Sequence, residues 1–287
     1  MIFPLPQVNS LVVINYDEAI YKIMNFKISS KKIKKKFIYG DFVENKKATT
    51  LVVFLSGLSG SRELPFLKVA SSEFFKYGFS TVRFNFCNDS DDKHQKDDAL
   101  TLEELSFSVY VTELKNILDS VGKKYSKIVL VGHSFGAPVA ILFLSKYKKY
   151  ANNTELVLWD PTILPWKKQW MEEDFVFDKD KGLYFGKHTK EVINKVFYGE
   201  CIRVDTVSIL HMLNRNACII AAKNSADKDA MKYFSKVHKK KTSVLHIIEK
   251  TDHYFKGIKA QKELFKTTLN FLDLIKKKVA ETKNNGL

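Results

Sequence analysis

The sequence predicts an α/β protein with a mainly parallel sheet, helices on both faces and a small inserted cap. Strand-like and helix-like segments alternate from about residue 50 to the end of the chain. The strand-like segments are short, apolar and rich in β-branched residues, as is typical of strands buried on both faces. With 287 residues, 45% of them hydrophobic, the chain can bury a large core. We expect a single domain over residues 1–287, with the cap inserted at about 161–205.

The order of the elements follows from these patterns. Residues 21–29 and 31–42 predict an antiparallel pair attached to the edge of the parallel sheet. The expected parallel strands lie at 49–57, 80–86, 127–131, 154–160, 217–222 and 243–249. Amphipathic segments that can each turn an apolar face to the sheet lie at 62–78, 101–122, 136–150, 227–240 and 258–281.

The segment from 161 to 205 interrupts this alternation. It is longer than a connection between two strands requires, and it carries many aromatic side chains among its charges. We interpret it as a cap whose aromatic side chains form the wall of a small-molecule pocket, although an equally apolar cap could simply cover the sheet. The expected substrate-binding residues are Trp166, Trp170 and, outside the cap, Tyr254.

Composition excludes several classes of protein. The net charge of +15 would suit an anionic partner, but the lysines are scattered over nearly every segment, which favours a compositional bias over a nucleic-acid site. Three irregularly spaced cysteines (Cys87, Cys201 and Cys218) indicate neither a disulfide framework nor a zinc site. No apolar run approaches the roughly twenty residues that span a bilayer, and no signal-peptide pattern opens the chain. We expect a cytoplasmic protein without metal or cofactor.

The stretch KIVLVGHSFGAP, residues 127–138, places Ser134 between a strand and a helix. Gly132 and Gly136 flank the serine in a G-x-S-x-G pattern, which in this context predicts a strained turn with the hydroxyl exposed at the carboxyl edge of the sheet. The helix N-terminus just beyond favours negative charge that develops there. We expect Ser134 to be a nucleophile; the alternative is a small polar residue on a tight turn.

A serine hydroxyl is a weak nucleophile until an oriented base takes its proton. His253 is the best candidate for that base, because it follows the last expected strand and comes after the serine in the chain. The other histidines fall in helix or strand patterns, in polar loops, or within the serine motif itself. Simple solvent exposure remains the alternative for His253.

Serine chemistry also requires donors for an oxyanion, usually two backbone N–H groups. The stretch VVFLSGLSGSRE ends an expected strand in a loop rich in Gly and Ser. We expect the amides of Leu58 and Phe135 to supply the donors. The glycines of this loop could instead serve only to make the turn.

The ordered set LSGLSG, VRFNF, GHSFGA, LWDP and TDHYF resembles the α/β-hydrolase superfamily over roughly residues 48–275, and most resembles its small bacterial serine esterases of the cinnamoyl or feruloyl esterase and monoacylglycerol lipase kind. The resemblance implies an α/β-hydrolase fold and a Ser-His-acid triad. In place of the family's His-Gly-aromatic-Thr-Gly oxyanion loop the chain has Ser56 to Gly60. The loop that follows VRFNF, beginning at Cys87, also departs from the Gly-rich family pattern.

The triad acid departs from the family pattern too. The family spacing, counted back from His253, lands on Ser225, which brings no charge. Asp227 lies two residues on and is the first choice for the acid, with a helix N-cap as its alternative role. Asp160, at the end of the preceding strand, occupies a position used by a minority of the superfamily and is the second choice. Asp229, or no acid at all, completes the alternatives.

Together these residues predict a serine hydrolase that cleaves a carboxylic ester or thioester through an acyl-enzyme. The expected partner is a small ester or thioester with an apolar acyl or aryl group, and the sequence does not indicate the oligomeric state. An acyltransferase would use the same residues, with an alcohol or thiol in place of water. From a different class, a binding or scaffold protein could retain the fold without turnover.

Overall fold

The computed structural model describes residues 7–16, 19–88, 92–237 and 242–284. It is built on a nine-stranded sheet in the order β1-β2-β3-β5-β4-β6-β7-β11-β12. The strands are β1 (Gln7–Tyr16), β2 (Ala19–Ser29), β3 (Phe37–Val43), β4 (Thr50–Leu55), β5 (Ser80–Phe84), β6 (Lys127–His133), β7 (Thr154–Trp159), β11 (Ala217–Ala222) and β12 (Val244–Ile248). The six strands β5, β4, β6, β7, β11 and β12 pair in parallel. Strands β1, β2 and β3 form an antiparallel edge. The mainly parallel sheet expected from the sequence is confirmed.

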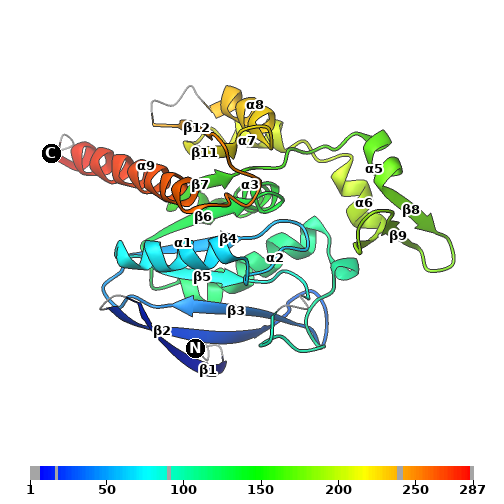
Figure 1. The fold of residues 1–287 in the computed structure, drawn as a ribbon, viewed down its shortest axis with the longest axis horizontal. Helices are drawn as coiled ribbons and strands as arrows, with labels where there is room; N and C mark the ends of the chain where they lie inside the picture. Colours follow the sequence, from blue (N-terminus) through cyan, green and yellow to red (C-terminus); the bar gives the residue numbers. More distant parts are fainter. Residues whose placement is uncertain (1–6, 17–18, 89–91, 238–241, 285–287) are drawn as a thin grey trace.

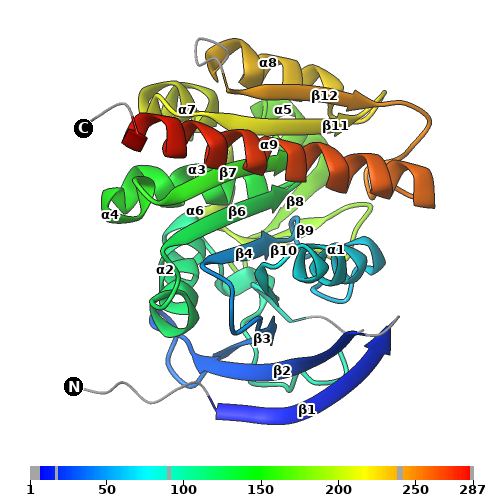
Figure 2. The same ribbon diagram turned by 90° about the vertical axis from the view of Figure 1, so that its left-hand side faces the viewer.

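Helices cover both faces of the sheet (Figures 1 and 2). The helical elements that pack around it are α1 (Pro65–Lys76), η1 (Leu102–Glu104), α2 (Phe107–Ile117), η2 (Leu118–Gly122), α3 (Gly136–Lys146), α4 (Lys148–Ala151), α7 (Thr206–Leu213), α8 (Asp227–Val237) and α9 (Ile258–Asn284). Alternate residues of β4 point to opposite layers: Val52 and Phe54 pack with α1 and α9, whereas Leu51, Val53 and Leu55 pack with α2 and α3. In the described ranges no helix is long and apolar enough to cross a membrane.

Two boundaries differ from the expectation for local reasons. The helix expected from residue 101 begins at Phe107, because the Ser106 hydroxyl accepts a hydrogen bond from the Val109 amide and caps the helix there. Residues 31–36, expected within a strand, form a loop instead. The buried Glu113 carboxylate accepts hydrogen bonds from the amides of Lys31 and Lys32, which turns the chain between β2 and β3.

The segment 161–205 forms a small layer of its own. It contains α5 (Lys168–Asp174), β8 (Phe175–Asp178), β9 (Leu183–Gly186), β10 (Val192–Asn194) and α6 (Lys195–Cys201), and its three strands make a second, antiparallel sheet. Figure 1 shows this layer standing to one side of the main sheet. It is tied to the core through Phe197, which is fully buried and packs edge-on against Phe135 at 5.5 Å between ring centroids.

Candidate active site

Ser134 occupies a strained turn between β6 and α3. Its φ angle is +51°, a left-handed conformation that a residue with a side chain adopts at a cost. The two flanking glycines allow the turn, since a Cβ at Gly136 would lie 2.3 Å from the Leu55 carbonyl oxygen and one at Gly132 would lie 2.6 Å from the Gly136 carbonyl oxygen. The Ser134 amide donates to the Trp159 carbonyl at 3.0 Å, which ties the turn to the end of the neighbouring strand β7.

His253 lies in the loop after β12, and its Nδ1–H donates to Asp160 Oδ2 at 2.5 Å. Asp160 directly follows β7, with a positive φ of 42° and a side chain that is 0% exposed. This hydrogen bond places the imidazole proton on Nδ1 and leaves Nε2 as an acceptor. The pair is therefore a base whose tautomer is fixed by a buried carboxylate.

Neutral donors hold the Asp160 carboxylate in addition to His253. The Ala222 amide donates to Oδ1 at 2.8 Å, and the Ser225 hydroxyl donates to Oδ2 at 2.5 Å. Burial pushes the pKa of Asp160 upward, but the hydrogen bonds from His253, Ser225 and Ala222 outweigh it and hold the pKa below its ordinary value. Asp160 is therefore charged at neutral pH despite its burial.

The structure places Asp160, rather than the first-choice Asp227, against His253. Asp227 is the first residue of α8, and its carboxylate pairs with Lys223 at 3.4 Å. The chain enters a helix at this residue, and the bulge expected to carry Asp227 under His253 does not form. Asp229 also points elsewhere, since its carboxylate accepts the Ile163 amide at 3.3 Å.

The residue before Ser134, His133, packs beside His253. The ring of His133 lies 4.6 Å from the ring of His253, centroid to centroid. The Ser134 hydroxyl makes a long hydrogen bond of 3.4 Å with the Thr162 hydroxyl, and within the described ranges no hydrogen bond joins it to His253. Hydrogen bonds within catalytic sites are often long or misaligned until a substrate binds, so the geometry is compatible with rotation of the Ser134 hydroxyl toward His253.

The loop 56–60 lies directly over Ser134. A Cβ at Gly57 would come within 3.3 Å of Ser134 Oγ and 3.9 Å of the Phe135 amide nitrogen, so the loop approaches as closely as a glycine permits. In the part of the chain that the structure describes, neither the Leu58 nor the Phe135 amide has a hydrogen-bond acceptor. Both amides are thus free to donate to an oxygen held beside Ser134.

A cavity of about 460 Å³ opens beside Leu58 and reaches under the segment 161–205. Seven of its fourteen lining residues are apolar, among them both expected tryptophans, Trp166 and Trp170, and the other seven are polar or charged. Tyr254, the third expected residue, does not line it and packs at 5.2 Å from the His253 ring instead. The size and the apolar part of the lining suit a small organic group.

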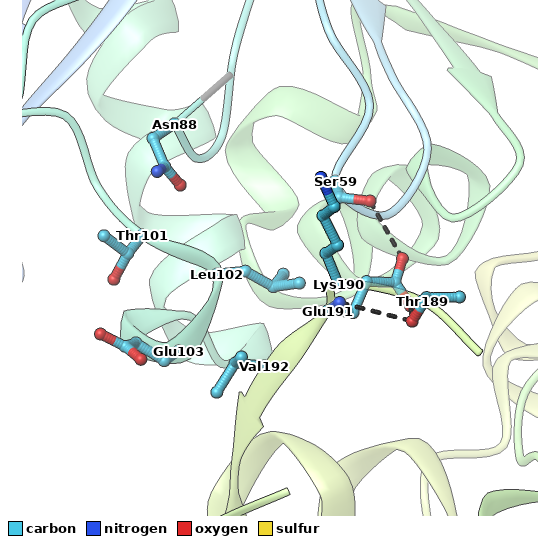
Figure 3. Close-up of a pocket in the computed structure, with 9 residues that line it drawn as sticks. All are labelled: Ser59, Asn88, Thr101, Leu102, Glu103, Thr189, Lys190, Glu191 and Val192. Atoms are coloured by element: carbon cyan, nitrogen blue, oxygen red, sulfur yellow. Dashed lines mark hydrogen bonds between the residues drawn. The ribbon is translucent and has the colours of Figure 1, made fainter. Parts of the chain in front are cut away.

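A second cavity, of about 450 Å³, shares Thr189 and Glu191 with the first in its lining (Figure 3). Figure 3 shows Asn88, Thr101 and Glu103 on one side of it and Ser59 and Lys190 on the other, and seven of its nine lining residues are polar or charged. Glu191 belongs to the walls of both cavities and accepts a hydrogen bond from the Ser59 hydroxyl at 3.0 Å. This bond joins the loop 56–60 to the segment 161–205.

Sequence reasoning missed the structural parts played by Ser225, Thr162 and Glu191. Ser225 carried a signal, because it stands where the family places its acid, but a serine there gives no hint that it donates to a carboxylate from another strand. Thr162 and Glu191 carried none, since their contacts depend on how distant loops meet. Within the described ranges, no group of three His, Cys, Asp or Glu side chains is arranged to hold a metal ion.

Comparisons with known proteins support the fold. No family model and no curated protein matches the chain. Among solved structures it is similar to a putative hydrolase from Agrobacterium vitis S4 (12% identity, 87% of this chain and 98% of that one, TM-score 0.64) and to Est1E from Butyrivibrio proteoclasticus (11%, 87% and 99%, 0.65). It is also similar to a thermophilic esterase from Thermogutta terrifontis (15%, 88% and 98%, 0.59). The sheet order, the serine turn and these likenesses together show that the chain has the α/β-hydrolase fold.

Proposed function

We propose that the chain is a serine hydrolase that cleaves a carboxylic ester or thioester through an acyl-enzyme on Ser134. The observation that carries the proposal is the 2.5 Å hydrogen bond between His253 Nδ1 and the fully buried Asp160 carboxylate, next to a serine held at positive φ. A buried charge paired with a histidine is costly for a merely structural role, and perturbed groups of this kind cluster at functional sites.

In the proposed first step, Ser134 Oγ attacks the carbonyl carbon of the ester while His253 Nε2 takes the hydroxyl proton. The hydroxyl leaves Thr162 by rotating about its side-chain bond. The carbonyl oxygen gains negative charge and accepts hydrogen bonds from the amides of Leu58 and Phe135. The imidazolium then gives its proton to the departing alcohol or thiol, and the acyl group stays on Ser134.

In the second step, water attacks the acyl carbon and gives a proton to His253 Nε2. The same two amides hold the oxyanion. Collapse of the intermediate breaks the bond to Ser134 Oγ, which recovers the proton from His253, and the carboxylic acid leaves. Asp160 keeps its charge throughout and stabilises the imidazolium in both steps.

The proposed substrate carries an apolar acyl or aryl group, held in the cavity beside Leu58. Support comes from the tryptophan-containing lining of that cavity and from its volume of about 460 Å³. Est1E, one of the similar structures, was solved with ferulic acid bound. Residues 161–205 act in this proposal as a cap over the site, within one domain.

The test is covalent labelling together with turnover. A fluorophosphonate probe should label the wild type and leave Ser134→Ala unlabelled, and nitrophenyl esters of graded acyl length should reveal a chain-length optimum. Loss of one member of a working triad lowers kcat by several orders of magnitude, so Ser134→Ala should lose nearly all turnover. The matched control is Ser235→Ala on α8, whose hydroxyl donates to the Lys232 carbonyl. Unchanged turnover in Ser134→Ala would contradict the proposal.

A further inference from the structure

His133, the residue before the serine, is buried in a way that the proposed reaction does not explain. Its side chain is 1% exposed, and its buried Nδ1 atom has no hydrogen-bond partner among the described residues. A buried imidazole that leaves one nitrogen unsatisfied carries a cost, and an apolar residue would avoid it. The ring must therefore provide something that an apolar side chain cannot.

The second ring nitrogen of His133 supplies the reason. Nε2 lies 2.8 Å from the backbone carbonyl oxygen of His253. A carbonyl oxygen only accepts, so Nε2 carries the proton and donates it. The bond joins two residues 120 positions apart in the sequence, one adjacent to Ser134 and the other His253 itself.

From this geometry we infer that His133 is a positioning residue, which fixes the backbone of His253 relative to Ser134 and so aims the His253 imidazole at the serine hydroxyl. The inference deepens the proposed function and rests on it. Asp160 holds one end of the imidazole through Nδ1, and His133 holds the main chain from which the imidazole projects. Two fixed points leave the ring little freedom to turn away.

Other contacts anchor the loop before and after His253, but they do not involve the His253 carbonyl. The Asp252 carboxylate accepts the amides of Tyr254 and Lys256, and Phe255 is fully buried with a φ of +50°. These contacts hold the loop to itself and to the core. Within the described ranges, the His133 ring is the hydrogen-bond donor to the His253 carbonyl.

An uncharged His133 ring also suits this position, because a charged ring would repel an imidazolium at His253. Burial, with the neighbouring His253 as the second cause, lowers the pKa of His133 to about 4. The titratable groups that face the ring are His253, Asp160 and Tyr254, and Phe66 closes the apolar side at 4.9 Å. His133 therefore stays uncharged above about pH 5 and does not oppose the imidazolium that forms on His253 during the reaction.

The test compares side chains that keep or lose the donor. The amide nitrogen of His133→Gln reaches the place of Nε2, that of His133→Asn falls about one bond short, and His133→Leu has none. With a nitrophenyl ester, we expect His133→Gln to retain at least about a third of the wild-type kcat, whereas His133→Asn and His133→Leu should lose at least about tenfold in kcat, with KM changed less than about twofold. If His133→Leu does not fold, His133→Gln and His133→Asn carry the test, since both new side chains are polar and differ mainly in reach.

A spectroscopic readout separates positioning from stability. The proton between His253 Nδ1 and Asp160 should give a far-downfield ¹H resonance in the wild type and in His133→Gln, and that signal should broaden or move upfield in His133→Asn. His246→Leu is the histidine control, because the His246 ring bonds Glu263 on α9. Equal kcat in all three His133 variants with an unmoved resonance would overturn the inference.

The same experiment distinguishes failure of the positioning role from failure of the proposed function. If the wild type neither reacts with a fluorophosphonate nor hydrolyses esters, the proposed function fails. The His253 resonance still tests the link in that case. A resonance that is identical in His133→Gln and His133→Asn overturns the positioning role, and one that changes only in His133→Asn supports it.

Discussion

Two buried carboxylate clusters in this molecule differ in the partner that balances their charge. In the first, at the end of β7, Asp160 is held by neutral donors and one imidazole. In the second, beside β3 and β5, Asp92 receives two parallel hydrogen bonds from Arg62 at 2.7 and 2.9 Å. Arg83, whose carboxylate partner is Asp41 on the paired strand, donates to the Arg62 carbonyl.

The comparison shows what a buried charge can do in each setting. A guanidinium is charged at every working pH, so Arg62 itself exchanges no proton, and its cluster serves to hold the chain that follows the loop 56–60. An imidazole can take up and release a proton, so in the proposed reaction the charge of Asp160 stabilises the imidazolium that forms on His253. We therefore expect changes in the first cluster to affect turnover and changes in the second to affect stability.

The largest effect should follow from removing the carboxylate of Asp160. Asp160→Asn leaves the size of the side chain unchanged but no longer fixes the imidazole tautomer, so kcat should fall by about 10³ to 10⁴ with the fold intact. Asp227→Asn is the matched control and should stay within about twofold of the wild type, since Asp227 pairs with Lys223. Near-full activity of Asp160→Asn, measured with a nitrophenyl ester, would contradict the triad assignment.

Breaking the guanidinium cluster should instead lower the free energy of unfolding. Arg62→Met leaves Asp92 buried without its cation, which should cost about 3 to 5 kcal/mol. Urea unfolding measures the loss. Arg203→Met, at an exposed arginine, should change stability by less than about 0.5 kcal/mol. A loss below about 1 kcal/mol in Arg62→Met would mean that the cluster contributes little.

The Asp92 carboxylate should also make stability depend on pH. Burial pushes the pKa of Asp92 upward, but the hydrogen bonds and charge of Arg62 outweigh it and hold the pKa below its ordinary value. Because the folded pKa is depressed, the stabilisation is present above the unfolded value of about 4 and is lost as pH falls through the lower folded value. The destabilisation caused by Asp92→Asn should therefore be largest near pH 7 and shrink toward pH 3. If the difference in unfolding free energy between the wild type and Asp92→Asn is the same at pH 7 and pH 3, the pairing of Asp92 with Arg62 is contradicted.

The smallest of these effects should come from Ser225. Ser225→Ala removes one neutral donor from Asp160 and leaves the His253 and Ala222 contacts in place, so kcat should fall by about tenfold, which corresponds to about 1.4 kcal/mol. Ser235→Ala should leave kcat unchanged. An effect as large as that of Asp160→Asn would mean that Ser225 acts directly in the reaction rather than through the carboxylate.

Much of the fold could be predicted because its signals are local. The runs of β-branched residues at β4, β6 and β11 are buried on both faces and read as strands without further information. The glycines around Ser134 likewise mark a turn that larger residues would obstruct. The loop containing Asp92 gave no such signal, because its shape depends on Arg62, which lies 30 residues earlier.

The sequence alone therefore determined the mainly parallel sheet and the serine turn after β6, and it singled out His253 as the candidate base among seven histidines. It could not decide which carboxylate faces His253, since counting along the chain favours the loop after β11, where Ser225 and Asp227 lie. The tertiary structure decided it: β7, β11 and β12 are adjacent and parallel, so their carboxyl ends converge and bring Asp160 to a histidine 93 residues away. Sequence spacing measures distance along one loop, whereas a parallel sheet sets distances between loops that the chain visits at widely separated points.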